Sequence, residues 1–378
     1  MRVLTFLHSF ELGGVERVAL RLVRRWRELG TDALLFVGRE DGPLRGELAP
    51  DLVYSSPRQP WFGSAWCETL WMIACLPGHI RRVRPDILFC AGSTYTIVAV
   101  AMKLLLGRHC PPVAAKISND LMRRDMPAPA RFAWRIWLKV QARFIDHWIV
   151  METGMCDDVA ATLGKVACTV IPDPAISAVQ IAATPPRSEM FGGEGRRFVA
   201  VGRLVAQKNY PMMLRAFARG ASPADTLTIL GGGPLADMLA EQSFALRIVG
   251  RVSFAGHVAD AGAQLGHYDC LLLSSDYEGV PAVLVEAMAA GVPILATDCG
   301  SGVRGVLDGG RFGRLVAVGD EAGFASEIAQ TRAAISIDGA AFDQARRFTI
   351  EAAGARYLDA FRAAEACPPL PTLSRMST

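Results

Sequence analysis

Glu278 and Glu286 stand eight residues apart in a stretch whose pattern predicts a loop followed by a helix. The apolar run Cys270–Leu273 before them has the length of a buried strand, and Pro281 is typical of the first turn of a helix. We therefore expect Glu278 in a loop at the carboxyl end of a strand and Glu286 inside the helix. Helix N-termini favour anions, and carboxylates accept hydrogen bonds from hydroxyl groups. The stretch thus suits a ligand that carries both phosphate and hydroxyl groups.

For either glutamate alone, the alternative is a solvated acid on a loop or on a helix surface. Glu286 lies between Val285 and Ala287 in a strongly apolar helix, where an ionised acid needs a partner. The surroundings of Glu286 therefore favour a functional role.

A second charged segment follows the predicted strand 198–201. Gly202 and Arg203 come directly after this strand, and Lys208 comes five residues after Arg203. A guanidinium fork can grip two oxygens of a diphosphate, and an ammonium group adds a point charge. Two unrelated surface cations are the alternative. A glycine turn followed by two cations predicts a diphosphate site.

Glycine turns follow other predicted strands. Gly13 and Gly14 separate the first strand from an amphipathic helix, Gly232 lies in the turn 231–234, and His257 follows a further glycine. Glycine lets the backbone approach a phosphate, ribose or base closely, although the same residues suit plain tight turns. His257 by itself is better explained as a structural loop residue.

These segments require strands that alternate with helices. The predicted strands are 3–7, 33–37, 87–90, 113–117, 198–201, 226–230, 252–255, 270–273 and 293–297. Repeated strand–loop–helix units predict an α/β protein with parallel sheets, whose ligands bind at the carboxyl edges. Two prolines in Val170–Pro174 mark a domain boundary.

Three segments resemble family 4 glycosyltransferases, which are retaining enzymes of the GT-B fold. They are Glu-Gly-x-Pro with a second Glu eight residues later, GRLVAQKNYP (202–211) and GGVER (13–17). The resemblance implies two Rossmann-like domains that face each other across a cleft. Residues 1–175 would bind the acceptor, with 348–378 packing back on them, and residues 190–347 would bind the nucleotide-sugar donor.

The same resemblance implies roles for individual residues. Glu278, Gly279 and Val280 would lie at the donor sugar, and Glu286 at the donor ribose. Gly13, Gly14, Gly202, Arg203 and Lys208 would face the diphosphate, and Gly232 and His257 would border the ribose or base. Arg203, Lys208 and Glu278 would be catalytic.

Two positions depart from the family pattern. Relatives carry a histidine on the acceptor side near residue 119, where this chain has Asn119 and Asp120. Either could replace it, and Lys116 could contribute a charge. Gly305 stands where relatives have a glutamate.

The expected activity is therefore retaining transfer of a sugar from a UDP- or GDP-linked donor to a glycan or lipid-linked acceptor. The resemblance places this reaction in bacterial cell-surface polysaccharide, lipopolysaccharide or glycolipid synthesis. We expect no cofactor and no metal, because the sequence has no Asp-x-Asp triplet and no histidine-rich spacing. The alternatives are a nucleotide-sugar epimerase of this fold and a non-catalytic membrane-surface protein. A nicotinamide enzyme is disfavoured because Gly13-Gly14 lacks the full Gly-x-Gly-x-x-Gly spacing.

Composition agrees with a globular enzyme. The chain has 378 residues, 51% of them hydrophobic, and a formal net charge of +3, which does not indicate nucleic acid as a partner. Nine scattered cysteines and an N-terminus unlike a signal peptide favour a cytoplasmic protein.

One segment indicates a membrane surface. Four cations recur every four residues in the stretch 131–148, which we expect to be helical, and tryptophans lie between them. The residues expected to face a membrane are Arg131, Trp134, Arg135, Trp137, Lys139 and Arg143. A basic, aromatic amphipathic helix suits an anionic membrane such as the inner face of the plasma membrane. A helix with one solvated face and its tryptophans in the core is the alternative.

Overall fold

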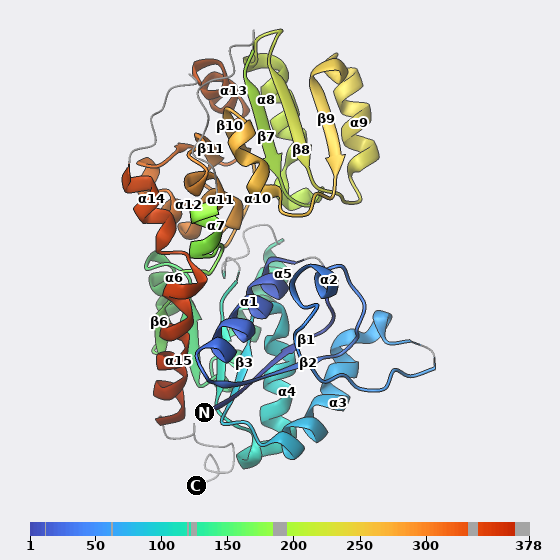
Figure 1. Ribbon diagram of the computed structural model, residues 1–378, viewed down its shortest axis with the longest axis vertical. Helices are drawn as coiled ribbons and strands as arrows, with labels where there is room; N and C mark the ends of the chain where they lie inside the picture. The colour runs from blue at the N-terminus through green and yellow to red at the C-terminus, as the bar shows by residue number, and fades with distance from the viewer. Residues whose placement is uncertain are drawn as a thin grey trace. The chain divides into compact units, whose positions relative to one another are not determined.

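The chain divides into two compact units, which are described separately (Figure 1). The computed structural model describes residues 1–11, 13–61, 63–118, 121, 127–183, 195–331 and 339–366. Unit 1 comprises Met1–Pro174 and Ile350–Thr378, and unit 2 comprises Ala175–Thr349. The chain first passes between the units directly after the stretch 170–174, in which two prolines restrict the backbone.

Unit 1 contains a six-stranded parallel sheet in the order β2-β1-β3-β4-β5-β6. Its strands are β1 (Arg2–Leu7), β2 (Asp32–Val37), β3 (Ile87–Cys90), β4 (Val113–Lys116), β5 (His147–Val150) and β6 (Cys168–Val170). Every residue of β3, β4 and β5 is buried, as expected for parallel strands covered by helices on both faces.

Helices cover both faces of this sheet. They are α1 (Gly14–Glu28), α2 (Leu44–Leu48), α3 (Glu68–Val83), α4 (Thr96–Leu106), α5 (Ala128–Gln141), α6 (Gly154–Leu163) and α15 (Ile350–Ala366). Right-handed crossovers place α3, α4, α5 and α6 in one layer, where each packs beside the next. On the other face α1 packs beside α15.

An aromatic cluster joins α15 to α1. Trp26 is fully buried, and its indole N–H donates to the Gly354 carbonyl at 3.1 Å. The Trp26 ring contacts Phe89 and Phe361 edge-on, with centroids 5.4 and 5.2 Å apart. The last helix of the chain is thereby part of the core of unit 1.

Unit 2 contains a second six-stranded parallel sheet, in the order β12-β11-β10-β7-β8-β9. Its strands are β7 (Arg197–Val201), β8 (Thr226–Leu230), β9 (Val252–Gly256), β10 (Cys270–Leu273), β11 (Ile294–Thr297) and β12 (Arg314–Val316). The order corresponds to that of a doubly wound dinucleotide-binding fold. The predicted α/β class with two parallel sheets is confirmed.

Two separate cores lie on the two faces of this sheet. The helices are α7 (Ala178–Ala183), α8 (Tyr210–Gly220), α9 (Ala236–Ala245), α10 (Ala261–Gln264), α11 (Ala282–Ala289), α12 (Ser301–Val306), α13 (Glu321–Gln330) and α14 (Gly339–Arg346). Residues of α8, α9 and α13 form one core, and residues of α7, α11, α12 and α14 form the other.

One predicted helix was wrong. The stretch 131–148 is not one helix, because α5 ends at Gln141 and Trp148 belongs to the buried strand β5. Arg143 therefore lies beyond the helix. Pro77 lies inside α3 without ending the helix. Met72, Leu76 and Ile80 are buried along α3, and this packing outweighs the hydrogen bond that proline removes.

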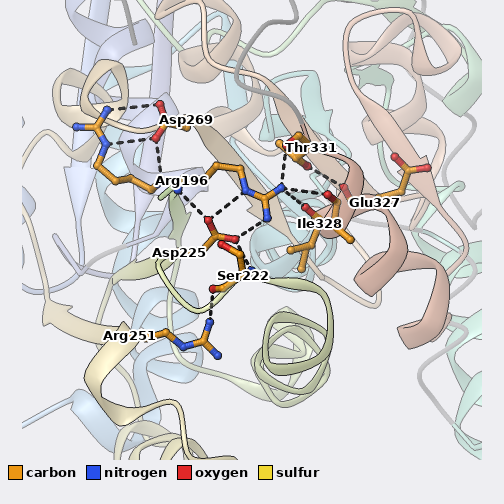
Figure 2. Close-up of polar contacts among 10 residues, drawn as sticks. Arg196, Ser222, Asp225, Arg251, Asp269, Glu327, Ile328 and Thr331 are labelled. Carbon is orange, nitrogen blue, oxygen red and sulfur yellow. Dashed lines mark hydrogen bonds and ion pairs between the residues drawn. The ribbon is translucent and has the colours of Figure 1, made fainter. Parts of the chain in front are cut away.

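A polar network fixes the amino edge of the unit 2 sheet (Figure 2). Asp225 is 1% exposed and accepts hydrogen bonds from the backbone N–H groups of Arg196, at 2.8 Å, and Ser222, at 2.6 Å. The Arg196 guanidinium contacts the same carboxylate and donates to the carbonyls of Ile328, at 2.6 Å, and Thr331, at 2.8 Å. The Arg196–Asp225 ion pair thus joins the start of β7 to the start of β8, and the further hydrogen bonds of Arg196 join both to the C-terminus of α13.

We expect Asp225→Ala to lower the free energy of unfolding by about 3 kcal/mol at pH 7, because it leaves a partly buried guanidinium unpaired. Burial raises the pKa of Asp225, but hydrogen bonds from Arg196 and Ser222 outweigh it and hold the pKa below its ordinary value. The stabilisation is therefore present above about pH 4 and lost as pH falls through the lowered pKa of the folded state. Urea unfolding at several pH values measures both effects.

The matched control is Asp343→Ala, which removes an exposed ion pair with Arg346 (3.3 Å). This control should cost less than about 1 kcal/mol. Equal losses for the two variants at pH 7 would show that the Asp225 network does not hold unit 2 together.

Candidate functional site

The strand order of unit 2 reverses between β7 and β10. The chain proceeds from β7 to β8 and β9 on one side and then returns to place β10 on the other. Ligands of such sheets bind outside the carboxyl ends of the strands at this switch point. The two loops that leave these ends carry the two charged segments singled out in the sequence, Gly202–Lys208 and Ser274–Glu278.

Lys208 and Glu278 meet directly at the switch point. The Lys208 Nζ atom lies 2.5 Å from Glu278 Oε1, and the side chains are only 17% and 10% exposed. The Ser275 hydroxyl donates to the same carboxylate oxygen at 2.7 Å. The fold thus brings together two residues that the sequence analysis singled out, although they are far apart in the chain.

The carboxylate also affects its neighbours. Burial, and then the nearby charge of Glu278, raise the pKa of the Tyr210 hydroxyl. The same two causes raise the pKa of Cys299 to about 12. Both groups are therefore neutral at pH 7, and the charged groups of this cluster are Lys208 and Glu278.

Residues that the sequence analysis did not single out hold the two loops together. The Ser274 hydroxyl donates to the Lys208 carbonyl at 2.7 Å, and the Gln207 amide donates to the Tyr277 carbonyl at 2.9 Å. The backbone N–H of Asp276 donates to the Gln207 carbonyl at 2.9 Å. The position of the Lys208–Glu278 pair is thus set by the backbone of both loops.

The first turn of α12, at Gly302, packs against Gly279 and Val280. A Cβ atom at Gly302 would lie 1.9 Å from the Gly279 carbonyl oxygen and 3.3 Å from a Val280 methyl group. Only glycine fits at position 302. Because glycine has no side chain, the loop that carries Glu278 can pass close to α12.

Glu286 lies on α11, as predicted, and is partly buried. A Cβ atom at Gly262 would lie 3.0 Å from the Glu286 carboxyl carbon. The Glu286 carboxyl group therefore lies against α10, which packs beside α11.

The predicted glycine turns lie on the same edge of the sheet. Gly202 has a φ of +152°, a conformation that favours glycine, and the Tyr210 hydroxyl donates to its carbonyl at 3.1 Å. The Leu204 backbone N–H donates to the Gly232 carbonyl at 2.9 Å, which ties the loop after β7 to the loop after β8. His257 is exposed directly after β9.

Arg203 is exposed, and no other residue in the described part of the chain holds its side chain by a hydrogen bond or ion pair. The carboxyl edge of unit 2 therefore combines one unpaired cation, one paired cation and one held carboxylate. This set can bind an anion and a hydroxyl group side by side.

The unit 1 sheet has its own switch point, between β1 and β3. Gly13 is the N-cap of α1, and Gly14 is its first residue. A Cβ atom at Gly13 would lie 1.9 Å from Glu16 Oε2, and the Tyr95 hydroxyl donates to Glu16 Oε1 at 2.5 Å. A carboxylate of the protein itself therefore already lies at this helix N-terminus.

His8, which follows β1, was not singled out from the sequence. Its ring is 4.7 Å from the Tyr95 ring, and Nε2 is buried with no hydrogen-bond partner among the described residues. Burial, and then the charge of Arg39, lower the pKa of His8 to about 4. The imidazole is therefore neutral at pH 7. Asn119 and Asp120, the predicted substitutes for the family histidine, lie outside the described residues.

The residues expected to face a membrane differ in exposure. Arg135, Lys139 and Arg143 are exposed, whereas Arg131, Trp134 and Trp137 are partly buried. The Trp134 indole N–H donates to the Leu121 carbonyl at 2.9 Å.

The most exposed apolar side chains of α5 are Phe132 (68%) and Ile136 (51%). No helix in the described ranges is long and apolar enough to span a bilayer. No group of three or more His, Cys, Asp or Glu side chains in those ranges is placed to bind a metal ion.

Both parts of the chain match models of glycosyltransferase families. Residues 12–174 match the model of the family described as Glycosyltransferase Family 4, and residues 195–333 match that of Glycosyl transferases group 1. The lipopolysaccharide core biosynthesis glycosyltransferase LpsE of Rhizobium meliloti is 33% identical over 132 residues, which are 35% of this chain and 38% of LpsE. The N-acetyl-alpha-D-glucosaminyl L-malate synthase of Bacillus anthracis is 35% identical over 119 residues, 31% of each chain.

The chain thus matches roughly a third of the length of these two relatives. Among solved structures, Anabaena HepE in complex with UDP and glucose superposes with a TM-score of 0.76 at 19% identity, covering 96% of this chain and 100% of HepE. This likeness shows the two-domain GT-B fold.

We expect Gly302→Ala to lower the free energy of unfolding by about 2 kcal/mol, because the new methyl group overlaps the Gly279 carbonyl. Hydrogen exchange should rise in residues 274–281 more than elsewhere. The control is Gly250→Ala, an exposed glycine with no atom within 4 Å of its Cβ position. Unchanged exchange in residues 274–281 of the Gly302 variant would contradict the packing described.

Proposed function

The chain belongs to the family 4-like glycosyltransferases, and from this premise we propose that it transfers a sugar from a nucleotide-diphosphate sugar to an acceptor hydroxyl with retention of configuration. The observation that carries the proposal is the Lys208–Glu278 pair at the unit 2 switch point, with exposed Arg203 on the same loop. This edge offers positive charge for a diphosphate and a carboxylate for sugar hydroxyls.

In this proposal the cations stabilise the charge that develops on the leaving diphosphate. Arg203 grips two phosphate oxygens, Lys208 adds a point charge, and Gly202 allows close approach of the backbone. Such preorganised groups need no reorganisation during bond cleavage, and removing one donor typically costs about a hundredfold or more in rate. Because two cations take this role, the proposed reaction needs no metal.

In this proposal carboxylates accept hydrogen bonds from the hydroxyl groups of the donor. Glu278 orients the donor sugar, with Gly279 and Val280 forming the adjacent backbone, and Glu286 binds the ribose. Gly232 and His257 border the base. In unit 1, Gly13 and Gly14 are weaker candidates for contact with a diphosphate, because the Glu16 carboxylate lies at the same helix N-terminus.

The comparisons support a UDP-linked donor and a cell-surface pathway. HepE is described in complexes with UDP and glucose and with UDP-glucose, and LpsE is described as acting in lipopolysaccharide core biosynthesis. We infer that this chain uses a UDP-linked sugar and a glycan or lipid-linked acceptor in bacterial cell-surface synthesis. An epimerase of the same fold remains the alternative, and it would change the configuration of the donor sugar with no acceptor present.

A layer of exposed apolar side chains in unit 1 supports a lipid-linked acceptor. Large apolar side chains are exposed on the neighbouring helices α3, α4 and α5 and on the short turn Ala65–Cys67 before α3: Trp66, Leu70, Ile97, Leu104, Leu105, Phe132 and Ile136. Arg135 and Lys139 are exposed on α5 between or beside them. Apolar side chains flanked by cations suit the interface of an anionic bilayer, so we propose peripheral attachment through this layer.

We expect UDP to raise the melting temperature of the protein in the presence of EDTA, because ligand binding stabilises only the folded state. Arg203→Ala and Lys208→Ala should each weaken UDP binding by about a hundredfold, the equivalent of losing one charge-assisted contact. Arg346→Ala, which removes an exposed cation of α14, is the matched control and should bind UDP normally. Differential scanning fluorimetry against UDP, GDP and ADP measures these effects.

A melting temperature that no nucleotide diphosphate changes would overturn the proposed donor site. Normal UDP binding by both the Arg203 and Lys208 variants would also remove the cations from the proposed mechanism. A shift that appears only with added magnesium would contradict the metal-independent mechanism while leaving the donor class in place.

We expect the protein to float with vesicles of phosphatidylglycerol and phosphatidylcholine and to remain unbound with phosphatidylcholine alone. The double variant Phe132→Ser/Ile136→Ser should lose at least tenfold in binding, because burial of each side chain contributes about 2 kcal/mol. Phe244→Ser, on α9 of unit 2, removes an equally exposed phenylalanine (77%) and should bind normally. Vesicle flotation that is equal for all three proteins would show that α5 does not contact the membrane.

A further inference from the structure

A surface hollow of about 610 Å³ lies beside the carboxyl end of β2 in unit 1. Its lining includes Glu40, Arg45 and Gly46, together with the ring of Tyr54. None of these residues belongs to the donor site proposed above. Ligand sites of this size typically combine apolar walls with a few fixed polar groups.

Polar side chains at the rim hold one another in place. The Tyr54 hydroxyl donates to Glu40 Oε2 at 3.2 Å, and the Ser56 hydroxyl donates to Glu40 Oε1. The Arg45 guanidinium lies 3.3 Å from Glu40 Oε2 and 5.8 Å from the centroid of the Tyr54 ring. The hydrogen bond from Ser56 lowers the pKa of Glu40, so its carboxylate is ionised at neutral pH.

The charges that line the hollow indicate which class of ligand it can bind. Because Arg45 and Glu40 form an ion pair, their charges cancel and the hollow does not concentrate positive charge for a phosphate. The remaining wall is apolar or aromatic, with Pro43, Leu52 and the Tyr54 ring. A sugar ring can pack its C–H groups against such an apolar wall, while the carboxylate accepts hydrogen bonds from its hydroxyl groups and the guanidinium donates to them. This combination fits a neutral sugar better than an anion.

The hollow adjoins the acceptor-side loops of unit 1. The Phe10 backbone N–H donates to the Asp41 carbonyl at 2.8 Å, and the Leu44 N–H donates to the Phe10 carbonyl at 3.0 Å. The Phe10 ring also meets the Tyr54 ring edge-on, with centroids 5.1 Å apart. The loop that follows His8 and leads to Gly13 is therefore bonded to the segment that forms the hollow.

We propose that this hollow is an acceptor subsite that binds a neutral sugar residue of a glycan, away from the hydroxyl that reacts. The inference rests on the proposed glycosyltransferase function and adds to it the class of acceptor. A subsite of this kind would make the enzyme prefer acceptors that already carry at least one neutral sugar.

Gly46 gives a direct test. It lines the hollow, is exposed on α2, and has no atom within 4 Å of its Cβ position, so a large side chain can enter the hollow without a backbone clash. Gly78 on α3 is also exposed with an open Cβ position but lies outside the hollow. Gly42 is unsuitable for such a test, because its φ is +121° and a Cβ atom would lie 2.1 Å from the Phe10 carbonyl carbon.

The experiment compares wild type, Gly46→Trp and Gly78→Trp as labelled full-length chains on a microarray of neutral bacterial-type oligosaccharides and their phosphorylated counterparts. We expect wild type and Gly78→Trp to bind the neutral oligosaccharides equally and Gly46→Trp to bind at least tenfold more weakly. Tyr54→Phe, which keeps the aromatic ring, should retain most of the binding that Tyr54→Ala loses.

Equal binding by Gly46→Trp and Gly78→Trp would overturn the subsite, as would preferential binding of phosphorylated glycans or no binding by wild type. The UDP-induced melting shift of the same samples separates this failure from failure of the proposed function. A preserved UDP shift without glycan binding rejects the subsite alone, whereas loss of the shift in wild type rejects the donor site as well.

Discussion

The Lys208–Glu278 ion pair imposes a constraint on the surrounding loops. Both charged groups are largely shielded from water. Removing two ions from water costs more free energy than their mutual attraction returns, unless further hydrogen bonds stabilise the ions. Ser275 supplies one such bond to the carboxylate, and Gln207 and Ser274 fix the backbones of the two loops. The pair therefore depends on an accurate fit between the loop after β7 and the loop after β10. A diphosphate placed beside Lys208 would share its ammonium group with Glu278 rather than find a free cation.

The carboxyl edges of the two sheets differ in charge. In unit 2 the charges of Lys208 and Glu278 offset each other, and Arg203 is an exposed cation on the same loop as Lys208. In unit 1 the Glu16 carboxylate lies at the α1 N-terminus, and His8 is neutral because burial lowers its pKa to about 4. Two sheets of similar construction thus offer different chemistry at the same edge. The exposed Arg203 of unit 2 suits the phosphates of the proposed donor, whereas the Glu16 carboxylate of unit 1 can accept a hydrogen bond from a hydroxyl group.

The sequence predicted most strands because most of them are short runs rich in apolar residues, which are typical of a parallel sheet. It missed β5, β6 and β12. At β5, aromatic residues and a cation spacing of four extend from α5 toward Trp148 and imitate a helix. The charged residues of the unit 2 site were found from motif spacing. Their pairing could not be found in this way, because Lys208 and Glu278 are 70 positions apart. The Tyr95–Glu16 bond, across 79 positions, and the isolated His8 Nε2 likewise require the packed sheet.

The helices on the two faces of the unit 1 sheet differ in the apolar surface that they expose, and this difference bears on the proposed acceptor. On one face α15 covers α1, and the buried Trp26 and Tyr357 close an aromatic core. On the other face the outward sides of α3, α4 and α5 carry large apolar groups, such as Leu70, Leu104 and Phe132. Monomeric proteins seldom expose large contiguous apolar patches without a partner. The C-terminal helix α15 therefore covers part of one face of the unit 1 sheet. The helices on the other face lack a comparable cover, and their exposed side chains have the composition that a bilayer interface would stabilise.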